Sequence, residues 1–155
     1  MAYRRCFFLN DLVQRILDDS LCSKFQKLRH NFAHLFFRQD SFDGKPVGII
    51  LKADRSELKA DGKDLAFVTV SLVDKDGNEC PDATNLLNFK LKGAGDYRAA
   101  CNGDATSLQQ FHLPVMKLFS GKLVVIVQSK EKAGDIVLRV SGKGLKSESL
   151  NIKAR

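Results

Sequence analysis

The stretch Ala66-Phe67-Val68-Thr69-Val70-Ser71-Leu72, followed by Asp74-Lys75-Asp76-Gly77-Asn78, decides the fold class of this chain. Along residues 66–72 an aliphatic side chain recurs at every second position, which is the period of a β-strand with one buried face. The polar run 74–78 is made of Asp, Asn, Gly and Lys, and the first three are typical of tight turns. Together the two stretches predict a strand and the turn that ends it.

The same pattern recurs through the chain from about residue 45 onward. Residues 87–91 alternate in the same way, and Gly93-Ala94-Gly95-Asp96 ends that strand. Short separators rich in Gly, Asp, Asn and Ser lie between the strands, without helices. About seven short strands at regular spacing predict a mainly β fold, an immunoglobulin-like antiparallel β-sandwich. The remaining predicted strands are Val47–Ala53, Tyr97–Cys101, Val115–Phe119, Leu123–Gln128, Ile136–Ser141 and Ser149–Lys153.

Residues 1–44 differ from the rest of the chain in composition, because they hold seven of its 11 Phe residues. From residue 11 to residue 37 apolar side chains recur at steps of three to five, which predicts one long or two short amphipathic helices. Such helices need a surface to cover, which is the rest of the chain, a partner or a second copy; self-association through residues 11–37 is one expectation. We therefore divide the chain into an N-terminal α-helical segment, residues 1–44, and a sandwich domain, residues 45–155.

The charge of the chain does not by itself identify a partner. Among 155 residues there are 25 Lys and Arg and 18 Asp and Glu, a net charge of +7. The basic residues alternate with apolar or acidic neighbours, which favours solubilising surface charge over a nucleic-acid site. No apolar stretch is long enough for a signal peptide or a membrane span. We expect no nucleic-acid and no membrane partner, and a cytoplasmic location for the chain as written.

The residue pattern also gives little support to metal or cofactor chemistry. The four Cys residues form no Cys-x-x-Cys pair and no set with zinc-ligand spacing. Free thiols are the preferred interpretation, and a Cys80–Cys101 disulfide stays open as an alternative. His30 and His34 share a helix face without an evident third ligand, and the turn after Asp74 lacks the Gly and Glu positions of a calcium loop. We expect no metal site and no cofactor.

The order of several turns resembles that of a known family. The run Lys52–Val70, the turns Val73–Asn78 and Asn102–Ser107, and the stretch Gly142–Ser147 are similar to the C-terminal immunoglobulin-like domain of glycoside hydrolase family 2 enzymes. The resemblance covers roughly residues 45–155 and is to β-galactosidases of the kind found in gut Bacteroidetes. An order of turns kept over this length is a stronger signal than any single motif.

The resemblance implies an accessory domain and not an enzyme. In this family two carboxyl groups cleave the glycosidic bond with retention, and both lie in a central (β/α)₈ barrel of about 250 residues. The 155 residues present cannot hold such a barrel, so we expect no catalytic residue. The expected function is interdomain packing in a parent enzyme, which would be periplasmic, and we expect the chain to be a truncated or detached part of a longer gene product.

A stand-alone carbohydrate-binding module is the alternative function. Sugars bind to exposed aromatic side chains that stack on the pyranose ring and to polar groups that fix the hydroxyls. The candidate contacts are Tyr97, Phe111, His112, Asn102 and Asp104. The structural alternatives are a loop that caps the sandwich, for residues 111–112, and a tight turn whose side chains bind nearby amides, for residues 102–104.

Overall fold

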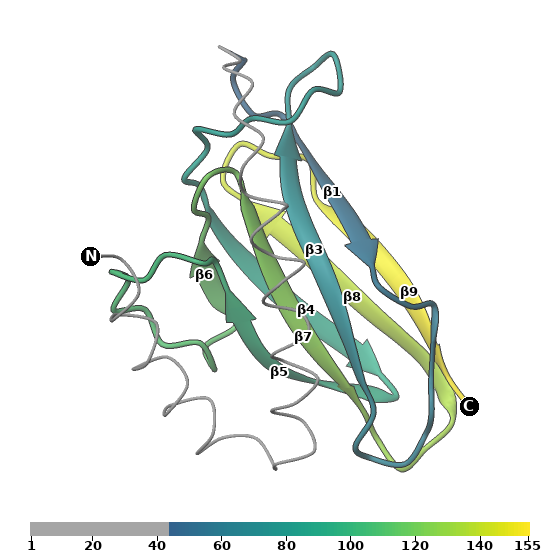
Figure 1. The fold of residues 1–155 in the computed structure, drawn as a ribbon. Coiled ribbons are helices and arrows are strands. Elements are labelled where there is room, and N and C mark those ends of the chain that lie inside the picture. Colours follow the sequence, from purple (N-terminus) through teal and green to yellow (C-terminus); the bar gives the residue numbers. More distant parts are fainter. Residues whose placement is uncertain (1–43) are drawn as a thin grey trace. The chain divides into compact units, whose positions relative to one another are not determined.

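The computed structural model describes residues 44–155, and in this part of the chain nine strands form two sheets (Figure 1). The predicted helices of residues 11–37, their self-association, and the pair His30 and His34 lie outside the described residues. The strands are β1 (Gly48–Ala53), β2 (Glu57–Leu58), β3 (Leu65–Val73), β4 (Leu86–Gly93), β5 (Gly95–Cys101), β6 (Val115–Lys117), β7 (Lys122–Ser129), β8 (Gly134–Gly142) and β9 (Glu148–Ala154).

The strand order identifies the sandwich type. One sheet has the order β1-β3-β7-β5 and the other the order β2-β9-β8-β4-β6. These orders correspond to the ABED and CFG sheets of the immunoglobulin fold, with β2 and β6 added at the two edges of the second sheet. The predicted β-sandwich is therefore confirmed. The prediction of purely antiparallel pairing needs one correction, because β2 runs parallel to β9.

The described residues form nine strands, and the eight strand segments predicted from the sequence match eight of them. The additional strand is β2, whose two residues are too few to show an alternating pattern in the sequence. Strand β6 ends at Lys117, two residues before its predicted end. The other predicted boundaries lie within two residues of the observed ones.

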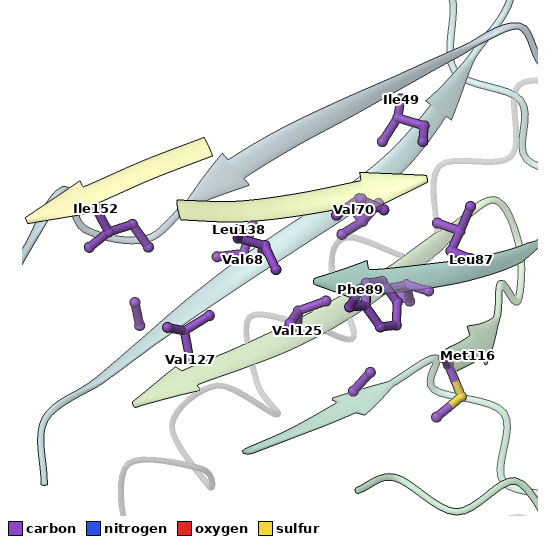
Figure 2. Packing of buried hydrophobic residues seen from close by; sticks show 14 of the residues in the cluster. Ile49, Val68, Val70, Leu87, Phe89, Met116, Val125, Val127, Leu138 and Ile152 are labelled. Atoms are coloured by element: carbon purple, nitrogen blue, oxygen red, sulfur yellow. The ribbon is translucent and has the colours of Figure 1, made fainter. Parts of the chain in front are cut away.

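The core lies between the two sheets and contains the side chains that alternate in the sequence (Figure 2). Val68 on β3 lies opposite Val125 on β7, and both are fully buried. The second sheet contributes Leu87, Phe89, Leu138 and Ile152, all buried. Each fully buried side chain of this kind stabilises the fold by roughly 1.5–3 kcal/mol, so this layer provides the main driving force for folding.

A single residue, Ala94, carries the chain from one sheet to the other between β4 and β5. Gly93 precedes it with φ +97°, a conformation that L side chains rarely adopt. A Cβ atom on Gly93 would lie 1.9 Å from the carbonyl oxygen of Asp135. The crossover therefore requires glycine at position 93 for its backbone angle and for space.

Candidate functional site

The five predicted contact residues lie on or beside one long connection, which joins β5 to β6 and spans residues 102–114. Tyr97 is on β5, Asn102 and Asp104 follow the end of that strand, and Phe111 and His112 come shortly before β6. The structure thus brings the predicted residues to one region of the fold, and their hydrogen bonds show how each side chain is used.

Tyr97 holds the connection in place. Its hydroxyl oxygen lies 2.7 Å from the carbonyl oxygen of Leu113 and 3.1 Å from that of Phe111. Its ring stacks on Phe89, with the ring centroids 6.0 Å apart and the planes 13° from parallel. Burial raises the pKa of Tyr97, so the hydroxyl stays a neutral donor. The one hydroxyl proton is shared between two carbonyls and one ring face is covered, which leaves little of this side chain for a sugar.

Asn102 closes the turn that follows β5. It is 3% exposed, its Nδ2 donates to the carbonyl oxygen of Lys117 at 2.9 Å, and its Oδ1 accepts from the amide of Asp104 at 3.1 Å. Gly103 between them has φ +78°, as tight turns of this kind require. The hydrogen bonds expected for a tight turn at residues 102–104, the structural alternative to a sugar contact, are therefore present.

The return of the connection toward β6 is held by its backbone. The carbonyl oxygen of Phe111 accepts from the amide of Ala100 at 2.8 Å, and the Phe111 ring packs partly buried against the core. Gln109 Oε1 accepts from the amide of Lys117 at 3.0 Å. Of the five predicted residues His112 is the exposed one. Carbohydrate binding by this set stays a prediction.

The two described cysteines are free thiols, so the alternative of a Cys80–Cys101 disulfide is not realised. Cys80 is buried with its sulfur 3.4 Å from the carbonyl oxygen of Gly44, while Cys101 lies on β5. Burial raises the pKa of both thiols. A thiol with a raised pKa stays protonated at neutral pH, which makes it a poor nucleophile and a poor metal ligand.

Asp74 is a buried carboxylate that serves a turn. Its Oδ1 accepts from the amides of Asp76 at 2.8 Å and Asn78 at 2.9 Å. Burial by itself would raise the pKa of Asp74, but the hydrogen bonds from Asn78, Asp76 and Gly77 outweigh it and hold the pKa below 3.8.

Nowhere in residues 44–155 do three or more His, Cys, Asp or Glu side chains gather as metal ligands would. In the same part of the chain no helix is long and apolar enough to cross a bilayer.

The outer face of the four-stranded sheet is a feature that the alternation pattern alone does not predict. Phe67 on β3 lies directly opposite Ile126 on β7, and Val124 lies one pair further along, opposite Thr69. Phe67, Val124 and Ile126 are 4–5% exposed, although they lie outside the core cluster. A sheet with one face in water alternates apolar with polar residues, so β3 and β7 carry a second apolar surface. We name these three side chains the β3–β7 outer face. The signal for it in the sequence is the apolar residue at positions 67, 124 and 126, where a polar one is expected.

The strand order, the turn positions and the apolar residues on both faces of β3 and β7 can be compared with known proteins. The model of the family described as glycoside hydrolase family 2 C-terminal domain 5 matches residues 49–151. The chain belongs to this family. The resemblance inferred from its turns is confirmed.

Relatives of this C-terminal domain 5 are parts of much longer enzymes. The β-galactosidase BoGH2A of Bacteroides ovatus is 45% identical over 111 residues, which cover 72% of this chain and 13% of the relative. A β-galactosidase of Thermoanaerobacter pseudethanolicus is 31% identical over 113 residues, which cover 72% of this chain and 14% of that enzyme. A solved family 2 glycosyl hydrolase from Bacteroides cellulosilyticus superposes with a TM-score of 0.70 at 31% identity, over 72% of this chain and 14% of that one.

The share of each relative that this chain covers shows which part of those enzymes it corresponds to. The chain spans 13–14% of the length of the relatives that it matches, and the match is to their C-terminal domain. The described fold consists of strands without a helix, so residues 44–155 do not contain a (β/α)₈ barrel. The chain therefore corresponds to a C-terminal accessory domain of family 2 glycoside hydrolases.

Proposed function

We propose that this domain packs against other domains of a family 2 glycoside hydrolase of the β-galactosidase type, and that it does so through the β3–β7 outer face. The single observation that carries the proposal is the set of apolar side chains on this face, Phe67, Val124 and Ile126. All three side chains are only 4–5% exposed, so this chain already keeps the face out of water, and in the enzyme a neighbouring domain would cover it.

The surroundings of this face support the proposal. Lys52 lies next to Thr69 at one border and is exposed, and Arg98 with Gln128 lies at the other, where the two side chains are hydrogen-bonded. An apolar centre with a polar border is the usual composition of a protein interface. The outer face of the five-stranded sheet, in contrast, carries charged and polar side chains at most positions of β4, β8 and β9.

The proposal is tested by mixing this chain with BoGH2A from which its own C-terminal domain has been deleted. We expect a 1:1 complex by sedimentation velocity and a higher melting temperature of the truncated enzyme. Ile126→Asp should abolish both effects, and Val124→Thr should weaken them. Because both residues are only 4% exposed, a thermal melt of each variant alone separates loss of binding from loss of fold. The matched control is Val137→Asp, a half-buried position on the outer face of the other sheet, which should leave both effects unchanged. The proposal fails if the wild-type chain gives no complex, or if both Asp variants bind equally well.

A further inference from the structure

Three cations lie together on the outer face of the five-stranded sheet. Lys90 on β4 is directly opposite Arg139 on β8, and Lys92 is the next outward residue of β4. All three side chains are exposed, and Arg139 Nη2 donates a hydrogen bond to the hydroxyl of Ser147 at 3.2 Å. Neighbouring strands are roughly 5 Å apart and outward residues of one strand roughly 7 Å apart, so the three residues form a compact triangle. We name Lys90, Lys92 and Arg139 the cationic triangle.

The cationic triangle is not explained by stability. Like charges directly opposite each other on antiparallel strands are destabilising. No carboxylate in residues 44–155 forms an ion pair with any of the three residues, whereas Lys122 pairs with Glu79 at 2.7 Å and Lys130 with Asp96 at 3.1 Å. Lysines often protect sheet edges from aggregation, and Lys90 and Lys92 lie beyond the pairing of β4 with β6, which ends at Asn88. Edge protection does not explain Arg139, because β8 is paired on both sides at this position.

The neighbours of the triangle indicate the chemistry of a ligand. Across from Arg139 and Val137, strand β9 presents Ser149 and Asn151, and Asn88 precedes Lys90 on the same face of β4. The side chains of these three neighbours are exposed amides and a hydroxyl, which donate and accept hydrogen bonds. None of the described residues on this face of β4, β8 and β9 is aromatic, so the face lacks the stacking platform on which single-stranded nucleic acids bind.

We propose that the cationic triangle is a binding site for an acidic polysaccharide. The guanidinium of Arg139 and the ammonium groups of Lys90 and Lys92 would bind the carboxylates of the sugar units. The amides of Asn88 and Asn151 and the hydroxyl of Ser149 would bind the sugar hydroxyls. An open sheet face accepts an extended polymer lying across the strands. The site is separate from the proposed interdomain face, which lies on the other sheet, and does not depend on it.

The test uses the full chain and polygalacturonate, with neutral galactan as the uncharged reference polymer, in affinity electrophoresis at low salt. The wild-type chain should be retarded by polygalacturonate and not by galactan. Lys90→Gln with Arg139→Gln should weaken retardation about tenfold, as two lost charge-assisted contacts imply. The matched control is Lys75→Gln with Lys132→Gln, which removes two exposed charges away from this face and should change the retardation less than twofold.

Several results would overturn the proposal. The first is no retardation of the wild-type chain, and the second is equal retardation by the neutral polymer. The third is equal weakening by the two double variants, because net charge alone would then account for binding. Tighter binding of a DNA duplex than of polygalacturonate under the same conditions would assign the face to nucleic acid instead. A thermal melt of each variant separates loss of binding from loss of fold. Lys90→Gln with Arg139→Gln should melt close to the wild type, because removal of a like-charge pair offsets the loss of the exposed hydrogen bond from Arg139 to Ser147.

Discussion

The hydroxyl of Tyr97 lies 2.7 Å from the carbonyl oxygen of Leu113, a residue 16 positions further along the chain. Between them the polypeptide leaves β5, forms the turn closed by Asn102 and returns along Phe111. One phenol therefore fixes the return of the β5–β6 connection against the strand from which it departs. A residue of the type that binds sugars in other proteins here serves the position of a loop.

Tyr97→Phe should destabilise the domain by about 1 kcal/mol, because the ring and its stacking on Phe89 remain while the hydrogen bond is lost. Urea unfolding followed by circular dichroism measures the change. The amides of the β5–β6 connection should also exchange faster with deuterium. Unchanged stability together with unchanged exchange would show that the hydroxyl does not hold this loop.

The same residue predicts a loss of stability at alkaline pH. Burial raises the pKa of Tyr97 above its ordinary value of 10.0, so the unfolded chain loses this proton at a lower pH than the folded one. The stabilisation is complete below pH 10.0 and declines as the pH rises above that value. The melting temperature of the wild-type chain should fall more steeply above pH 10.0 than that of Tyr97→Phe. Parallel curves for the two proteins would contradict this assignment.

Gly93→Ala should destabilise the domain by about 3 kcal/mol or more, because the left-handed backbone and the collision with the carbonyl of Asp135 act together. Gly77→Ala is the matched control. Gly77 has φ +86° with nothing within 4 Å of the added Cβ atom, so only the backbone strain remains, about 1 kcal/mol. Thermal unfolding of the two variants compares the effects. Equal losses would mean that the crossover at Ala94 can shift to make room.

The turn of Asp74 should make the domain sensitive to acid. Hydrogen bonds from Asn78 and Asp76 hold the pKa of Asp74 below 3.8 despite burial, so the folded state favours the carboxylate. This stabilisation is present above pH 3.8 and is lost as the pH falls through the lower, folded-state pKa. Asp74→Asn should be less stable near neutral pH and should show a weaker decline below pH 3.8 in urea titrations. A decline as steep as that of the wild type would assign the acid sensitivity to other carboxylates.

Lys90→Glu should raise the melting temperature while it weakens binding to polygalacturonate. The substitution places a carboxylate directly opposite Arg139 and replaces a like-charge pair with an ion pair. An exposed pair of this kind contributes up to about 1 kcal/mol. Scanning calorimetry and affinity electrophoresis on the same preparation measure the two effects. A drop in melting temperature would mean that the side chains at positions 90 and 139 do not meet.

Much of the fold follows from the sequence because alternation and turn chemistry are local. The strand at residues 66–72 and the turn after it are both present, and the family follows from the order of such turns. Strand β2 has no such signal, since its two residues are fixed by pairing with β9, far away in the chain. The turn role of Asn102 is predictable from the sequence, since its bond to the amide of Asp104 is local. The hydrogen bonds from Tyr97 to Leu113 and from Asn102 to Lys117 escape prediction, because these carbonyls become neighbours only in the folded sandwich.

The central pairing of the four-stranded sheet joins β3 to β7, which come from opposite halves of the described sequence. No local hairpin can therefore form this pair, and during synthesis β3 must wait until β7 has left the ribosome. Domains dominated by such distant pairings fold in milliseconds to seconds, not in microseconds. Throughout that interval β3 exposes apolar side chains on both of its faces, which makes the nascent chain prone to aggregation and a substrate for chaperones.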